Sequence, residues 1–159
     1  MMSMNIRYII GTILSVSILF GCQSKEAKDS QLALLKTTNP SPMVVEKKTE
    51  ENLELVDKIK KDVADFEEIY DVAVIKGNGD VLVVYKVKHL KRFHMKKIEK
   101  KMTKLLEKNY PDEEFTVSSD YKIFMEAVEL NEKMQDPKYS EEKAKKKFNQ
   151  ILELEREMT

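Results

Sequence analysis

The apolar positions of the chain change their spacing along its length, and this spacing predicts where helices lie. In residues 50–66 they recur at the period of a helix that buries one face. The same period returns in residues 92–109, after Asp120 and again after Ser140. Thr49 precedes the first of these segments and is expected to cap its N-terminus. The sequence therefore predicts four helices in its C-terminal two thirds.

Strand-like runs lie between these helical segments. Residues 70–75 and 81–87 are rich in β-branched and aromatic residues, and Gly77-Asn78-Gly79 separates them. An Asn-Gly turn between two such runs predicts a β-hairpin. Phe115-Thr116-Val117 predicts a short third strand. The predicted order is α-β-β-α-β-α plus an extra C-terminal helix. This order indicates an α+β fold, a small two-layer sandwich whose three-stranded sheet carries helices on one face.

The N-terminal apolar run is short for a transmembrane helix. It covers residues 8–20, whereas a spanning helix needs about 20 apolar residues and a signal peptide about 7–15. Leu19-Phe20-Gly21-Cys22 ends the run and has the form of a lipobox, where a bacterial precursor is cut before a lipid-modified cysteine. Cys22 is also the single cysteine of the chain. The alternative is an uncleaved N-terminal anchor with an incidental cysteine.

These features divide the chain into four predicted parts. Pro40 and Pro42 discourage a helix in the polar segment after the cysteine and favour an extended spacer. The last helix has three possible positions, since it can extend the helical layer, pair with a partner or stand apart. The parts are a lipoprotein signal peptide (1–21), a flexible linker (22–49), an α+β domain (50–135) and a C-terminal helical extension (136–159).

The charge of the chain is balanced overall but uneven along its length. Its 28 basic and 28 acidic residues give no net charge, which argues against a nucleic-acid partner. Residues 86–108 are strongly basic, whereas residues 46–71 lean acidic. These segments are either two solvated faces, or the basic face contacts anionic lipid headgroups or wall polymers. The lysines that share one helical face in the basic segment are Lys97, Lys101, Lys104 and Lys108.

No pattern in the chain predicts chemistry at a catalytic or metal site. His89 and His94 lie at a strand-to-helix junction without a cysteine or carboxylate cluster, so they are expected to be surface histidines. Ser118, Ser119 and Asp120 are better explained as a helix cap than as part of a catalytic triad. We therefore expect no catalytic residue, no metal, no cofactor and no enzymatic activity.

The order of these elements resembles a known family. The lipobox and polar spacer precede a helix, the hairpin from Asp71 to Tyr85, a second helix and a strand that passes through Val117 to Asp120 into a further helix. This pattern resembles the YhcN/YlaJ-type sporulation lipoproteins of endospore-forming Bacillota. The resemblance covers roughly residues 50–135 and the lipobox, and it carries no catalytic residue over to this chain.

The resemblance implies a spore-associated lipoprotein with a role in sporulation, spore germination or outgrowth, acting as a non-catalytic interaction module. Acyl chains on Cys22, palmitate among them, would anchor it to the extracytoplasmic side of the cell membrane or to a spore membrane. Expected partners are the lipid bilayer, an anionic lipid or wall polymer, and another envelope or spore protein. The alternative is an envelope lipoprotein similar to BON domains, which would bind phospholipid headgroups or a small ligand.

Overall fold

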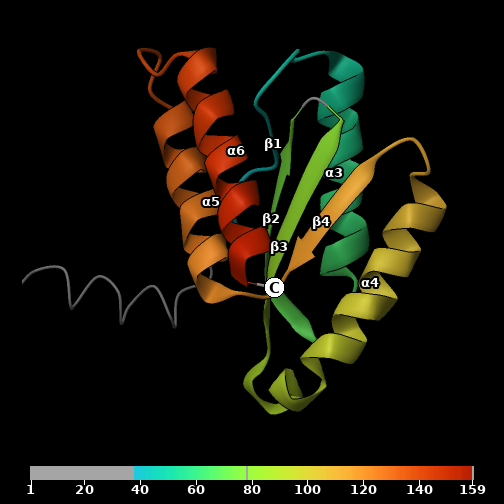
Figure 1. The fold of residues 1–159 in the computed structure, drawn as a ribbon. Coiled ribbons are helices and arrows are strands. Elements are labelled where there is room, and N and C mark those ends of the chain that lie inside the picture. The colour runs from blue at the N-terminus through green and yellow to red at the C-terminus, as the bar shows by residue number, and fades with distance from the viewer. Residues whose placement is uncertain (1–37, 78, 159) are drawn as a thin grey trace, which may run out of the picture. The chain divides into compact units, whose positions relative to one another are not determined.

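The structure is a computed structural model that describes residues 38–77 and 79–158. Cys22, the signal peptide and the first half of the predicted linker lie outside the described residues. Within them the chain forms two short connected units, each a strand, a helix and a parallel strand, followed by two further helices (Figure 1). The elements in order are β1 (Met43–Val44), α3 (Glu50–Ala64), β2 (Ile69–Lys76), β3 (Asp80–Val87), η2 (His89–His94), α4 (Met95–Asn109), β4 (Glu114–Ser118), α5 (Tyr121–Met134) and α6 (Glu141–Met158).

The described sheet has four strands in the order β1-β2-β3-β4. The predicted hairpin is confirmed, because β2 and β3 pair antiparallel with Val74 opposite Val83. Gly79 has a positive φ of 96°, as turns of this hairpin type favour. β1 and β4 add to the two edges in parallel. The prediction of three strands was wrong, because the two-residue β1 is too short to leave a strand pattern in the sequence.

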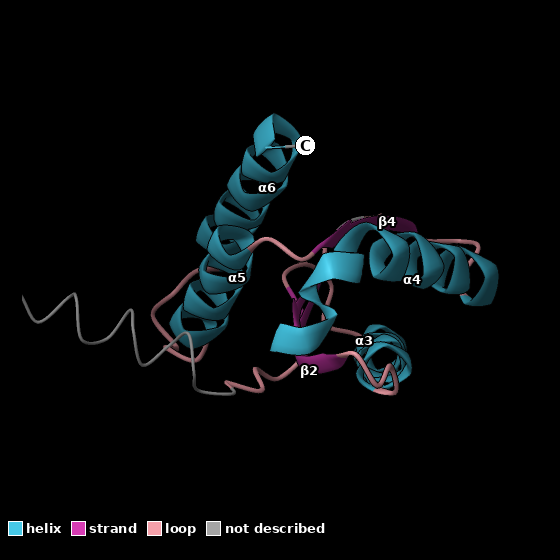
Figure 2. Cartoon of the chain, turned by 90° about the horizontal axis from the view of Figure 1, so that it is seen from below, coloured by secondary structure: helices cyan, strands magenta, loops and turns pink. Residues whose placement is uncertain are grey.

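Helices cover both faces of this sheet (Figure 2). Side chains alternate along β3, so that Val81, Val83 and Tyr85 face α3 and α4, while Leu82 and Val84 face α5 and α6. The α+β class is confirmed, but the two-layer arrangement with helices on one face was wrong. The central strands β2 and β3 are buried on both faces. This burial explains why their sequences contain consecutive apolar residues rather than an alternating pattern.

The last helix forms part of the second layer. Ala144, Phe148 and Ile151 of α6 are buried against the sheet and α5. A Cβ atom on Gly77, directly after β2, would clash with the ring of Phe148. That position therefore needs glycine so that the Phe148 ring can approach the backbone closely. Of the three positions open to the last helix, the structure shows an extension of the helical cover.

Residues 38–46, which the sequence placed in the linker, are held to the rest of the domain by several elements. The backbone N–H groups of Thr38 and Asn39 donate to the carboxylate of Asp71 at 2.8 and 3.0 Å. Lys60 of α3 donates to the Pro40 carbonyl at 2.7 Å, and Asn131 of α5 donates to the Ser41 carbonyl at 2.6 Å. The segment thus enters the fold as an ordered edge of the sheet.

Asp71 also forms a buried ion pair with Lys86, which lies opposite it on β3. Their closest N–O distance is 3.3 Å, and the side chains are 0% and 6% exposed. The Lys86 ammonium lies 4.5 Å from the centre of the Phe124 ring of α5. A buried charge is tolerated only where partners of this kind replace water. This pair therefore connects the entering chain, the hairpin and α5.

Replacing Asp71 with alanine is expected to lower the free energy of unfolding by about 3–5 kcal/mol, because Lys86 stays buried without its carboxylate. Urea unfolding of the chain from Gln23 to Thr159 measures the change. The matched control is Glu54→Ala, which removes the exposed Glu54–Lys58 pair and should cost less than about 1 kcal/mol. Equal losses in the two variants would contradict the structural role of the buried pair.

Candidate functional site

The predicted lysine face lies on α4. This helix packs Ile98, Met102 and Leu106 against the sheet, and the opposite side of the helix is exposed. The structure leaves all four predicted lysines exposed. Lys97 and Lys101 line one groove, and Lys101 also lies over the ring of Phe66, which follows the C-terminal end of α3. The exposed residues of the predicted face are Lys97, Lys101, Lys104 and Lys108.

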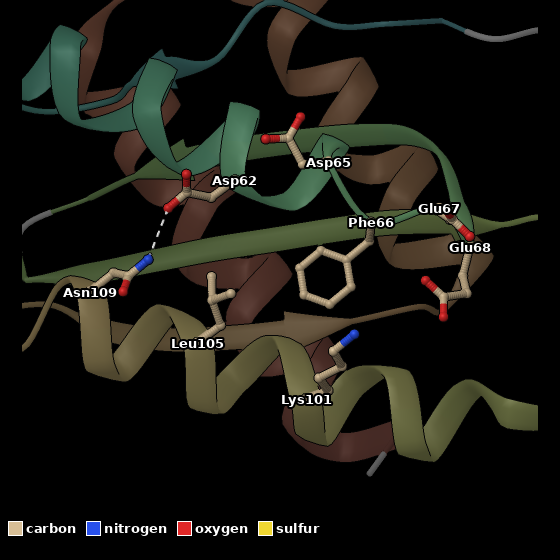
Figure 3. A pocket seen from close by; sticks show the side chains of 8 residues that line it. All are labelled: Asp62, Asp65, Phe66, Glu67, Glu68, Lys101, Leu105 and Asn109. Carbon is tan, nitrogen blue, oxygen red and sulfur yellow. Dashed lines mark hydrogen bonds between the residues drawn. The ribbon is translucent and has the colours of Figure 1, made fainter.

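Lys101 lies in a groove between the end of α3 and α4 (Figure 3). Its ammonium lies 5.1 Å from the centre of the Phe66 ring, and Phe66 and Leu105 supply the apolar part of the groove. The groove has a volume of about 390 Å³ and is open to solvent. The rest of its lining is mostly acidic, so Lys101 lies among negative charges. A neighbouring groove also brings Lys101 beside Lys91 and Lys97. The acids that line it are Asp62, Asp65, Glu67 and Glu68.

Asp62 closes one end of this groove. Its carboxylate accepts hydrogen bonds from the Tyr110 hydroxyl at 2.9 Å and from the Asn109 side chain at 3.2 Å (Figure 3). Burial, together with the hydrogen bond to this carboxylate and its negative charge, raises the pKa of Tyr110 to about 12. These contacts join α3 to α4, so the acidic and basic segments of the sequence face each other here. Such an arrangement stabilises the layer of helices.

Another groove lies where α4, the end of β4 and the start of α5 meet. The expected cap is confirmed, because the Asp120 carboxylate accepts from the backbone N–H groups of Lys122 and Ile123 at 2.7 and 3.1 Å. Glu99 and Glu155 also line the groove. Burial and the nearby charge of Glu155 raise the pKa of Glu99. Asp120 is thus occupied as a helix cap, as the sequence predicted.

Two apolar side chains that the sequence analysis did not single out stand on the surface of η2. Leu90 is 85% exposed and Phe93 is 93% exposed. The neighbouring His89 and His94 are exposed as well. The sequence did contain a hint of this exposure, since these two apolar residues lie within the most basic segment. Only the structure distinguishes them from core residues, because spacing cannot show that nothing packs on them.

The described part of the chain has no group of three or more His, Cys, Asp or Glu side chains placed to hold a metal ion. Within residues 38–77 and 79–158, none of the helices has the length and hydropathy to cross a membrane. The tethering residue predicted from the sequence, Cys22, lies outside this part. The described features that bear on binding are therefore surface grooves, the exposed lysines of α4 and the apolar side chains of η2.

Comparison with known families identifies the chain. The sequence model of the family described as "Sporulation lipoprotein YhcN/YlaJ" matches residues 34–153. The chain belongs to this family. The resemblance predicted from the sequence is thus confirmed, and the match reaches beyond the predicted range to include β1 and most of α6. No curated protein and no solved structure matches the chain. Membership in the YhcN/YlaJ family indicates a sporulation lipoprotein and, with it, attachment to a membrane.

Replacing Tyr110 with phenylalanine tests the connection between α3 and α4. The raised pKa means that folding keeps the phenol protonated, so its stabilising effect is present below about pH 10 and is lost as the pH rises through about 12. The variant should lose about 1 kcal/mol at neutral pH and show a smaller further loss between pH 10 and 12. Urea unfolding at each pH measures this change in stability. The control is Glu129→Gln, which removes the exposed ion pair between Glu129 and Lys133. An unchanged alkaline slope would contradict the assignment.

Proposed function

We propose that the protein is a lipid-anchored envelope lipoprotein that acts in sporulation, spore germination or outgrowth as a non-catalytic interaction module. The observation that carries this proposal is the family match over residues 34–153. The closed build of the domain supports it, because helices cover both faces of the sheet and the hollows that the described residues line are open grooves. A surface of this kind suits the binding of a partner rather than the enclosure of a substrate.

The proposed anchor is a diacylglyceryl group on Cys22, on the extracytoplasmic side of the membrane. Each buried methylene contributes about 0.8 kcal/mol, and a single acyl chain binds only reversibly, whereas two chains hold a protein stably. The lipobox Leu19-Phe20-Gly21-Cys22 supports this proposal. With this anchor, the polar segment after Cys22 would connect the bilayer to Thr38, whose backbone N–H donates to Asp71.

The exposed lysines of α4 are the proposed contact with anionic lipid or wall polymer. Lys97, Lys104 and Lys108 are exposed, and each basic residue near an anionic membrane contributes about 1 kcal/mol. Lys101 is a weaker candidate for this contact than the other three, because it lies over Phe66 in the acidic groove. The charge of the α4 surface supports an envelope partner of negative charge.

Replacing Cys22 with alanine is expected to abolish acylation and to leave an uncut precursor, because the cysteine is both the acceptor of the lipid and the residue after the cut. Metabolic labelling with a palmitate analogue, with the size of the protein read on a gel, measures both steps. Ser24→Ala is the matched control, and it should be labelled and cut normally. A labelled and fully cut Cys22→Ala protein would contradict the proposed anchor.

Following a tagged copy through the life cycle of the host tests the role in sporulation. The protein is expected to accumulate during sporulation and to be recovered with the membrane fraction of the spore. Deleting the gene should delay germination or outgrowth, measured as the loss of optical density of a spore suspension. Equal abundance in growing cells together with absence from spores would refute this role.

A further inference from the structure

The most unusual surface of the domain is η2. None of its residues is buried, although it contains Leu90 and Phe93. A side chain as large as phenylalanine normally buries most of its surface in a core or an interface. At 93% and 85% exposure, Phe93 and Leu90 contribute almost nothing to the packing of the domain. The charge of the neighbouring residues therefore indicates what kind of partner these two side chains could contact.

Those surroundings are basic. The sequence has no acidic residue from Val81 to Ile98, and none of the cations around η2 forms an ion pair with a described residue. Glu68 shares a groove with Lys91 and Lys97. Glu99 and Glu155 share another with Lys96. The apolar side chains thus lie in a segment whose exposed charges are positive. The exposed cations of this segment are Lys88, Lys91, Arg92, Lys96 and Lys97.

η2 also lies at the end of the domain where the preceding chain enters. Thr38 is bound by Asp71, Asp71 lies opposite Lys86, and η2 follows directly after β3. In Figure 1 this is the lower end, whereas α3 begins at the upper end. When fully extended, the chain between Cys22 and Thr38 spans at most about 55 Å. Thr38, the described residue that follows the predicted tether in the chain, therefore lies at the same end of the domain as η2.

We propose that η2 inserts Leu90 and Phe93 into the interfacial region of an anionic lipid bilayer, while the surrounding cations bind the headgroups. A bilayer supplies both halves of the required surface, because acyl chains lie directly beneath a layer of negative charge. The long side chains of Lys91 and Arg92 can keep their charges at the headgroups while the apolar tip enters more deeply. The position of the tether rests on the proposed function, but the insertion itself needs no acyl group.

Fluorescence of an introduced tryptophan tests the insertion, since the chain has no tryptophan of its own. The chain from Gln23 to Thr159 keeps every described residue and lacks the apolar run and Cys22. Its Phe93→Trp variant should show a blue-shifted emission with vesicles made of equal parts phosphatidylglycerol and phosphatidylcholine. The matched control is Leu53→Trp, which places the probe at an apolar, 43% exposed position in the first turn of α3, and its emission should not change.

Flotation with the same vesicles measures how much Leu90 and Phe93 contribute to membrane binding. Changing both Leu90 and Phe93 to serine should lower the partition coefficient by about tenfold or more, because two apolar side chains no longer leave water. Leu53→Ser should have no effect. Changing Lys91 and Lys97 to glutamate in the Phe93→Trp variant should weaken binding at low salt, while the emission of the bound fraction stays blue-shifted.

Three results would overturn the proposal. The first is that the chain does not float with the vesicles at low salt. The second is that the Phe93→Trp variant floats but its tryptophan emission is not blue-shifted. The third is a blue shift without vesicles that grows with protein concentration, which would indicate a second copy of the chain as the partner. Urea unfolding of each variant checks that the fold is retained, and little change is expected because exposed positions contribute little to stability. Because this chain lacks Cys22, its result is independent of the acylation test, and either proposal can fail while the other stands.

Discussion

The arrangement of the domain depends on one buried ion pair between neighbouring strands. Asp71 and Lys86 face each other on the side of the sheet that α5 covers, and removing both charges from water is costly. The cost is offset because the carboxylate also accepts hydrogen bonds from Thr38 and Asn39. The ring of Phe124 lies against the ammonium. Entry of the chain, register of the hairpin and position of α5 are therefore determined at a single point.

The second constraint is that the hairpin must be covered on both faces. Val83 and Leu82, adjacent in β3, belong to opposite cores. Two helices are needed on each side, and α6 completes the cover over Gly77, where its Phe148 ring comes close to the backbone. Because packing uses the apolar faces of all four helices, what remains for interaction is their outer, charged surface and the connections between elements. The candidate contact surfaces of the protein therefore lie on α4 and η2.

Charge is divided on this outer surface in a way that separates structural from interacting groups. Asp62 binds Tyr110 and Asn109 and so belongs to the contact between α3 and α4. Lys101 faces the same acidic groove. The cations around η2, by contrast, have no described acid as an ion-pair partner and flank exposed apolar side chains in the chain. Within one basic segment of the sequence, Lys101 thus lies in the groove between α3 and α4, whereas the cations around η2 are exposed to solvent.

Local features of the sequence determined the helices, their caps and the hairpin, because these depend on residues close together in the chain. Thr49 and Asp120 cap the helices that were expected to follow them, and the family resemblance was recognisable from the same local order. The consecutive apolar residues 72–75 of β2 and 81–85 of β3 carried a further signal, since strands of this kind are buried on both faces. Only the tertiary structure decided that α5 and α6 supply the second cover and that Met43–Val44 adds a strand. It alone also decided that Leu90 and Phe93 remain outside, because burial depends on contacts between residues distant in sequence.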